Sequence, residues 1–195
     1  MNSPFSRVRL VDFSDRQYRA LLDRMATFRK PKGAGPTSRD LFSKDAERTL
    51  RRWLSGQTHL TILRIIHYYE RVGVHQVERY REVDGVGRAG DTLLLFEVKT
   101  GHTRATVRQG MTQLATAREI LATRFPNIIT CLLLVDTDDA TNSDIARFLG
   151  HAEDLRVIRS LDDLTTDGRP HVLRFSVDDV TTLSHVPVHL AWRVA

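Results

Sequence analysis

The chain has 195 residues, of which 41% are hydrophobic and 27% charged, a composition typical of a folded globular protein and not of a disordered or fibrous one. Its single cysteine, Cys131, excludes an internal disulfide framework and a cysteine-based zinc site, and it suits a reducing compartment. The longest apolar stretch, Ile128–Val135, is too short to span a bilayer, and the N-terminus has no signal-peptide core. We therefore expect a soluble, cytoplasmic protein that does not enter a membrane.

Positive charge is concentrated in the first quarter of the chain. Residues 1–52 contain 13 Lys and Arg against 6 Asp and Glu, whereas residues 53–195 contain 16 against 18. A basic surplus of this kind attracts a polyanion such as nucleic acid, and the alternative is an uneven surface charge without a partner. Lys99 also stands out, because no other lysine occurs after Lys44.

The N-terminal part of the chain is expected to form an arm. Arg7–Phe13 has the composition of a short strand, and the apolar spacing over Asp15–Arg29 predicts a helix. The Pro- and Gly-rich segment Lys30–Ser38 is expected to be a linker. The predicted organisation is therefore a basic N-terminal arm with its linker over residues 1–38, followed by a main domain over residues 39–195.

The first part of the main domain is expected to be helical and then to change to strands. Helical spacing predicts helices over Arg39–Leu54 and Thr58–Val72, and Gly73 is a suitable residue to end the second helix. Three strands are predicted next, the last two joined by a tight turn at Gly90-Asp91: Val74–Tyr80, Glu82–Arg88 and Thr92–Lys99.

A helix and a buried strand follow these three strands. One apolar stripe predicts a long helix over Arg104–Arg124, and the continuous apolar run Ile128–Val135 predicts a central strand covered on both faces. The remaining expected elements are a helix near Ser143–Gly150 and strands near Leu155–Ile158, Val172–Val177 and Val188–Val194. The order of helix, three strands, helix and strand over residues 58–135 places the chain in the α/β class.

Two charged residues end a strand that is otherwise apolar. Because alternate residues of a strand share a face, Glu97 and Lys99 lie on the same side of the strand Thr92–Lys99. Burying charged groups costs several kcal/mol each unless partners compensate. One interpretation is therefore a structural ion pair between Glu97 and Lys99 at the rim of the sheet.

The preceding strand favours a second interpretation, a cation site. Glu82 and Asp84 alternate on one face, and a tight hairpin would bring one of them near Glu97. Three carboxylates beside the single Lys99 would carry excess negative charge, which a divalent cation would neutralise. Oxygen ligands without Cys or His favour Mg²⁺ or Mn²⁺.

These residues resemble the motif of the PD-(D/E)xK nuclease superfamily, which includes restriction endonucleases and Holliday-junction resolvases. Asp84 precedes a hairpin, and Glu97-Val98-Lys99 ends the next apolar strand, in the segment REVDGVGRAGDTLLLFEVKTG. The segment is most similar to the form found in resolvase-like members. The resemblance covers about residues 40–135 and implies an αβββαβ core with a central mixed sheet flanked by helices. The N-terminal helical arm and the C-terminal strands would lie outside that core.

The resemblance also implies roles for these residues. Asp84 and Glu97 would be metal ligands together with the main-chain carbonyl of Val98, and Lys99 would activate water and stabilise charge on the phosphate. Members of the superfamily often add a glutamate from an earlier helix, for which Glu47 is the candidate and a solvated helix residue the alternative. Some members also have a glutamine on the following helix. Gln113 is the candidate for this role, with Gln109 one turn earlier.

The expected function is that of a Mg²⁺-dependent nuclease that hydrolyses phosphodiester bonds, with DNA as the expected substrate and a homodimer as the expected assembly. Two alternatives remain open at this point. The first is a non-catalytic nucleic-acid-binding or assembly subunit that keeps the nuclease fold. The second is an unrelated α/β protein in which Glu97 and Lys99 form a structural pair.

Overall fold

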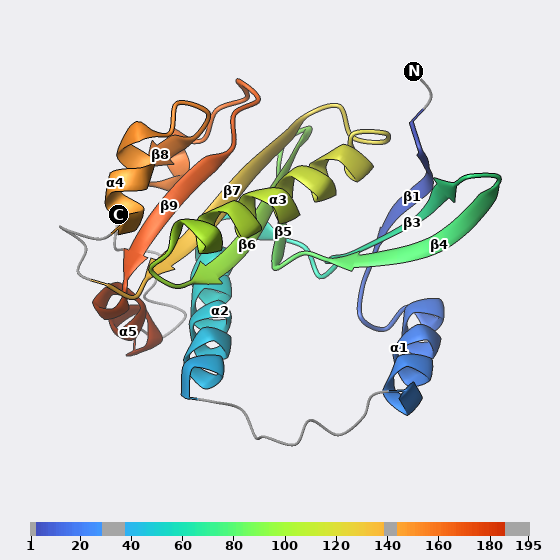
Figure 1. Cartoon of the computed structure of the whole chain (residues 1–195), viewed down its shortest axis with the longest axis horizontal. Helices are drawn as coiled ribbons and strands as arrows, with labels where there is room; N and C mark the ends of the chain where they lie inside the picture. Colours follow the sequence, from blue (N-terminus) through green and yellow to red (C-terminus); the bar gives the residue numbers. More distant parts are fainter. Residues whose placement is uncertain (1–2, 29–37, 139–143, 186–195) are drawn as a thin grey trace.

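The computed structural model describes residues 3–28, 38–138 and 144–185. The expected linker before Ser38 and the expected strand Val188–Val194 lie outside these residues. Within the described part, two sheets lie side by side, a larger one surrounded by helices and a smaller one that carries the N-terminal strand (Figure 1). No helix of the described residues is both long and apolar enough to cross a bilayer.

The larger sheet has six strands in the order β2-β5-β6-β7-β9-β8. β5 runs antiparallel to its neighbours β2 and β6, whereas β6, β7, β9 and β8 run parallel, so the sheet is mixed. All nine residues of β7 are buried, as its uninterrupted apolar sequence predicts for a central strand. The strand bounds are β2 His59–Leu60, β5 Gly85–Ala89, β6 Thr92–Thr100, β7 Ile128–Asp136, β9 His171–Ser176 and β8 Arg156–Ile158.

Helices cover both faces of this sheet, and the alternating side chains of β6 show why. Leu93 and Leu95 pack in the core beneath α3 and α4, while Leu94 and Phe96 pack in the core beneath α2 and α5. Both faces of β6 are therefore apolar and buried, as expected, and the coarse α/β class with a mixed, helix-flanked sheet is confirmed. The helix bounds are α2 Ser38–Gln57, α3 Arg104–Leu121, α4 Asp144–His151 and α5 Val177–His185, with a short 3₁₀ turn at Leu161–Asp163.

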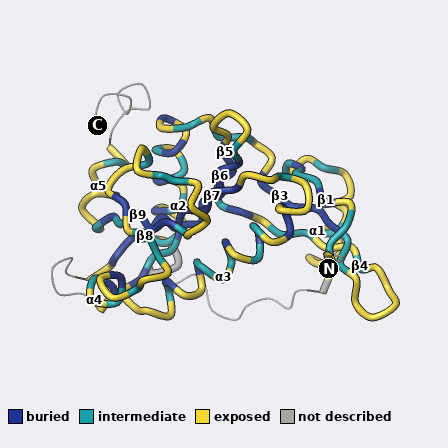
Figure 2. The backbone as a smooth tube through the Cα atoms, turned by 90° about the horizontal axis from the view of Figure 1, so that it is seen from above, coloured by how far each residue is buried: buried dark blue, intermediate teal, exposed yellow. Residues whose placement is uncertain are grey.

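The smaller sheet has the order β1-β3-β4, with β1 at Phe5–Val11, β3 at Ile65–Val72 and β4 at His75–Glu82. Val8 and Ile66 belong to the same core cluster as the α3 side of the larger sheet. Helix α1, Arg16–Phe28, buries Tyr18 against the other face, whereas most of the helix and the β3–β4 tip are exposed (Figure 2). Part of the expected N-terminal arm thus contributes a strand to a sheet.

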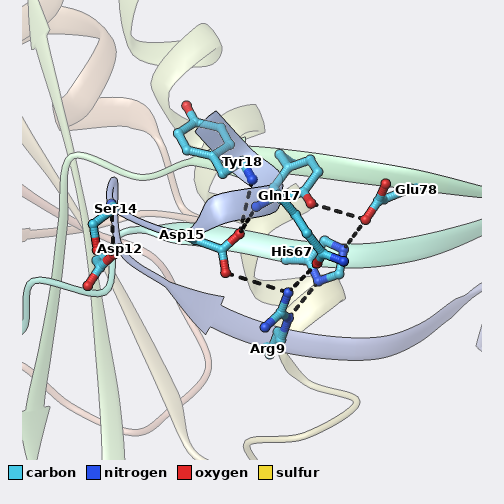
Figure 3. Close-up of polar contacts among 9 residues, drawn as sticks. Arg9, Asp12, Ser14, Asp15, Gln17, Tyr18, His67 and Glu78 are labelled. Atoms are coloured by element: carbon cyan, nitrogen blue, oxygen red, sulfur yellow. Dashed lines mark hydrogen bonds and ion pairs between the residues drawn. The ribbon is translucent and has the colours of Figure 1, made fainter. Parts of the chain in front are cut away.

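A buried histidine ties the strands of the small sheet together (Figure 3). Arg9 Nε donates to His67 Nδ1 at 2.8 Å, so His67 Nε2 carries the proton and donates to Glu78 Oε1, also at 2.8 Å. Arg9 also lies 3.6 Å from Asp15, the residue whose carboxylate caps the start of α1. This chain of polar contacts fixes α1 and β1 to the β3–β4 hairpin.

The helix expected over Thr58–Val72 is wrong. The segment forms the short strand β2 and then β3, which is the central strand of the small sheet. The β-branched and aromatic residues of Ile65–Tyr69 favour a strand once partners are available on both sides. Gly73 does have a positive φ of 62°, but it turns the β3–β4 hairpin and does not end a helix. The chain therefore has five strands, not three, between α2 and α3.

Candidate functional site

The site begins where two strands separate. The segment Glu82–Arg88, expected to be one strand, is broken, since β4 ends at Glu82 in the small sheet and β5 begins at Gly85 in the large one. The last backbone pair of β5 and β6 joins Gly85 to Phe96. Beyond it, Asp84 replaces the missing strand partner, because its Oδ2 accepts a hydrogen bond from the Val98 N–H at 2.7 Å. The Asp84 carboxylate is thereby held against the end of β6.

Glu97 and Lys99 lie in β6 immediately before and after Val98. Lys99 Nζ donates to Glu97 Oε1 at 2.5 Å, and the Glu97 side chain is only 7% exposed. The stem of Lys99 passes beneath α3 at Gly110, where an added Cβ would lie 3.1 Å from Lys99 Cγ. The absence of a side chain at Gly110 therefore makes room for the lysine. The structure brings Asp84, Glu97 and Lys99 together at the carboxyl end of β6.

Helix α2 closes the other side of this group. A cavity of about 250 Å³ at the end of β6 is lined by Glu47 and Lys44 from α2 and by Val98 and Lys99 from the strand. Ser43 Oγ and Thr100 Oγ1 are 2.5 Å apart, which fixes α2 to the end of β6 one turn before Glu47. Glu47 is thus half-buried and lines the cavity at the end of β6, and its role at the site stays a prediction.

The positive charge near the carboxyl groups of the site does not fully offset their burial and their negative charge. Burial, reinforced by the negative charge of Asp84, raises the pKa of Glu97 to about 7, although Lys99 opposes the rise. Burial also raises the pKa of Asp84, against the hydrogen bond from Val98 and the charge of Lys99. The pKa of Glu47 rises through burial and then through the charge of Asp84. Burial thus raises the pKa of all three acids, and the charge of Asp84 adds to the rise at Glu97 and Glu47, so a bound cation would be favoured here.

Arg64 is a site residue that the sequence interpretation missed. Its side chain is buried, its Nη1 donates to the main-chain carbonyl of Asp84 at 3.2 Å, and its Nη2 lies 3.7 Å from Glu82 Oε1. The guanidinium also lies 4.7 Å from the ring centre of Phe13. Glu82 is therefore paired with Arg64, whereas Asp84, which follows the end of β4, contacts Val98 next to Glu97. The sequence analysis missed Arg64 because it placed this residue in a helix over Thr58–Val72. The strand-forming residues that follow Arg64 were the signal that could have predicted a strand there.

Gln113, the predicted glutamine, lies on α3 one turn after Gly110, the residue that packs over the stem of Lys99. Among the described residues its Oε1 is buried without a hydrogen-bond partner, and Gln109 is exposed. The role of Gln113 in the site stays a prediction.

The oxygen atoms at the site fit a hard divalent cation. Within the described residues no group of three or more His, Cys, Asp or Glu side chains is arranged to hold a metal ion. Asp84 and Glu97 each use one carboxylate oxygen in the contacts above and retain a second, and the carbonyl of Val98 points to the same side of β6 as its N–H, toward Asp84. Mg²⁺ and Mn²⁺ suit such a set, since Mg²⁺ takes one or two carboxylates and keeps several waters.

Comparisons of the chain with known protein families, with characterised proteins and with solved structures give no match. The interpretation of the site therefore depends on the geometry and the chemistry of its own residues.

The raised pKa of Glu97 has a consequence for stability. A carboxyl with a higher pKa in the folded state favours folding while protonated, and this contribution is lost as the pH rises from the ordinary value of 4.5 through about 7. Without metal, we expect Glu97→Gln to unfold at a higher temperature than the original chain at pH 8, by roughly 3 °C or more, with no difference near pH 4. Thermal unfolding in EDTA across this pH range measures the effect.

The same experiment with 5 mM Mg²⁺ tests the cation directly. We expect Mg²⁺ to raise the melting temperature of the original chain at pH 8 and to leave that of Glu97→Gln unchanged, because the substitution removes one ligand charge. An equal shift in both proteins would contradict Glu97 as a ligand.

Proposed function

We propose that the chain is a metal-dependent nuclease of the PD-(D/E)xK type, which hydrolyses phosphodiester bonds in nucleic acid, with DNA as the expected substrate. One observation carries the proposal. Because β4 and β5 separate, the Asp84 carboxylate accepts a hydrogen bond from the Val98 N–H and lies directly beside the paired Glu97 and Lys99. One buried acid, Glu97, one half-buried acid, Asp84, and the amine of Lys99 then lie together at the end of β6, with Glu47 added from α2.

Each side chain has a physical role in this proposal. Asp84, Glu97 and the Val98 carbonyl would hold Mg²⁺ or Mn²⁺, which when bound polarises the scissile phosphate and lowers the pKa of a water. Lys99 would exchange its contact with Glu97 for the phosphate, where its fixed positive charge stabilises the negative charge that develops during attack. Glu47 would accept a hydrogen bond from the attacking water.

The test is cleavage of supercoiled plasmid DNA. We expect the full chain to nick or linearise the plasmid with Mg²⁺ or Mn²⁺, to be inactive in EDTA, and to lose at least about 100-fold in rate on Lys99→Ala. Arg71→Ala, which removes an exposed cation from the β3–β4 hairpin, is the control and is expected to leave the rate within about twofold. Activity that is independent of metal and of Lys99 would overturn the proposal.

A non-catalytic nucleic-acid-binding subunit is the second candidate. The observation that favours it is the ion pair between Lys99 and Glu97, which occupies the amine, together with the basic surface of α2 next to the site. Retention of DNA on the protein with no cleavage under any metal would support this function and exclude the nuclease.

A further inference from the structure

A basic groove runs along α2 and meets the candidate site at Glu47. Most of its lining residues belong to α2, and the others, Leu60–Ile62, belong to the segment that connects α2 to β3. The groove has a volume of about 620 Å³, and Glu47 lines both this groove and the cavity that contains Lys99. A molecule lying in the groove therefore reaches the candidate site directly.

The basic side chains of the groove repeat with the helix turn. Lys44, Arg48 and Arg52 are spaced four residues apart, so they succeed one another by roughly 6 Å along the helix, and all three are exposed. Arg51 adds a fourth, half-buried cation near Glu47. Arg48 also pairs with Asp45 at 2.7 Å, but both side chains are well exposed, so a phosphate can replace this partner at little cost. A regular row of cations suits the phosphates of one nucleic-acid strand.

The segment that follows α2 adds an exposed apolar side chain to the lining of the groove. Ile62 lines the groove and is 71% exposed, and Leu63, the next residue in the chain, is 37% exposed. The turn that carries them is rigidly held, since the Thr61 N–H donates to the Val86 carbonyl at 2.8 Å and the Leu63 N–H donates to Thr61 Oγ1 at 2.8 Å. Exposed aliphatic groups fixed beside a row of cations are suited to contact the faces of bases, which are available only where a strand is unpaired or unstacked.

We propose that the groove along α2 binds the phosphates of one nucleic-acid strand while Ile62 packs on its unpaired bases, so that the preferred substrate is single-stranded or forked and not a continuous duplex. This inference rests on the proposed function and specifies the substrate class of that site. A strand held in this way passes Glu47 and enters the cavity at the end of β6.

Binding in EDTA, where cleavage does not interfere, tests the proposal. Fluorescence anisotropy would be measured with the full chain and three labelled DNAs: a single strand, a fork with unpaired arms, and a blunt duplex of the same sequence. We expect the single strand and the fork to bind at least fivefold more tightly than the duplex. Equal or tighter binding of the blunt duplex would overturn the proposal.

Two groove variants, each with a control variant elsewhere on the surface, test whether binding depends on the groove. Arg48→Gln combined with Arg52→Gln is expected to weaken binding about tenfold and to reduce the slope of log affinity against log salt by about 2. Ile62→Ser is expected to reduce fork binding roughly fivefold and to leave duplex binding unchanged. The controls are Arg71→Gln and Val74→Ser, exposed residues of the β3–β4 hairpin, which should change neither value. If the groove variants bound DNA with the same affinity as these controls, the groove would be excluded as the binding site.

The outcomes distinguish the two proposals. Loss of binding by the groove variants without metal-dependent cleavage by the original chain would retain the groove and reject the nuclease. Cleavage that needs Lys99 but is unaffected by the groove variants would retain the nuclease and reject the groove.

Discussion

Replacing Asp84 with asparagine is expected to reduce metal-dependent cleavage by a factor on the order of 10³, while the protein keeps its fold. An asparagine oxygen can still accept the hydrogen bond that Val98 donates to Asp84 Oδ2 at 2.7 Å, so the substitution removes the charge and retains the strand contact. Because burial raises the pKa of Asp84, removal of its charge should not lower the melting temperature at pH 8. Plasmid cleavage rates and thermal unfolding measure the two effects.

Asp84→Ala is the matched comparison. It removes both the charge and the acceptor, so it should lose activity to the same extent and also lose about 1–2 kcal/mol of stability, because the Val98 N–H is left without its partner. Intact mass must be checked for Asp84→Asn, since an asparagine before Gly85 deamidates to aspartate and would restore the site. An active Asp84→Asn protein of the correct mass would contradict Asp84 as a ligand.

Gly110→Val is expected to destabilise the protein by about 2 kcal/mol or more and to lower cleavage at least about tenfold. A Cβ at this position would lie 2.6 Å from Leu132 Cδ1, in the core, and 3.1 Å from Lys99 Cγ. Helix α3 or Leu132 must move, and the lysine stem is displaced with them. Denaturant unfolding and the rate of plasmid cleavage report the two consequences.

The same substitution at Gly150 provides the control. Gly150 also lies in a helix, but apart from its chain neighbours and the helix's own backbone no atom of the described residues lies within 4 Å of an added Cβ. We expect Gly150→Val to leave stability within about 0.5 kcal/mol and activity unchanged. If the two variants behaved alike, helix propensity and not the space reserved for Lys99 would explain the effect.

The two central strands could be predicted from the sequence because their signals are local. The apolar run of β7 and the alternation along β6 each satisfy the requirements of a strand buried on both faces. The tight turn at Gly90, whose φ is 58°, sets the register that pairs Gly85 with Phe96. That register, in turn, places Asp84 beside Val98. The proximity of Asp84 to the Glu97–Lys99 segment was therefore predictable from residues 84–99 alone.

Other features depended on partners that are distant in the chain. Whether Ile65–Val72 forms a helix or a strand is decided by β1 and β4, which pair with it on both sides. The position of Glu47 depends on how α2 packs on the sheet, and Arg64 faces Asp84 only because the strands of two sheets separate there.

The sequence by itself thus indicated that Asp84 lies close to Glu97 and Lys99, since turn chemistry and side-chain alternation act over a few residues. Only the tertiary structure decided that Glu47, Arg64 and the space at Gly110 complete the group. Contacts between elements far apart in the chain are set by packing and charge compensation in the folded state, which local sequence patterns do not contain.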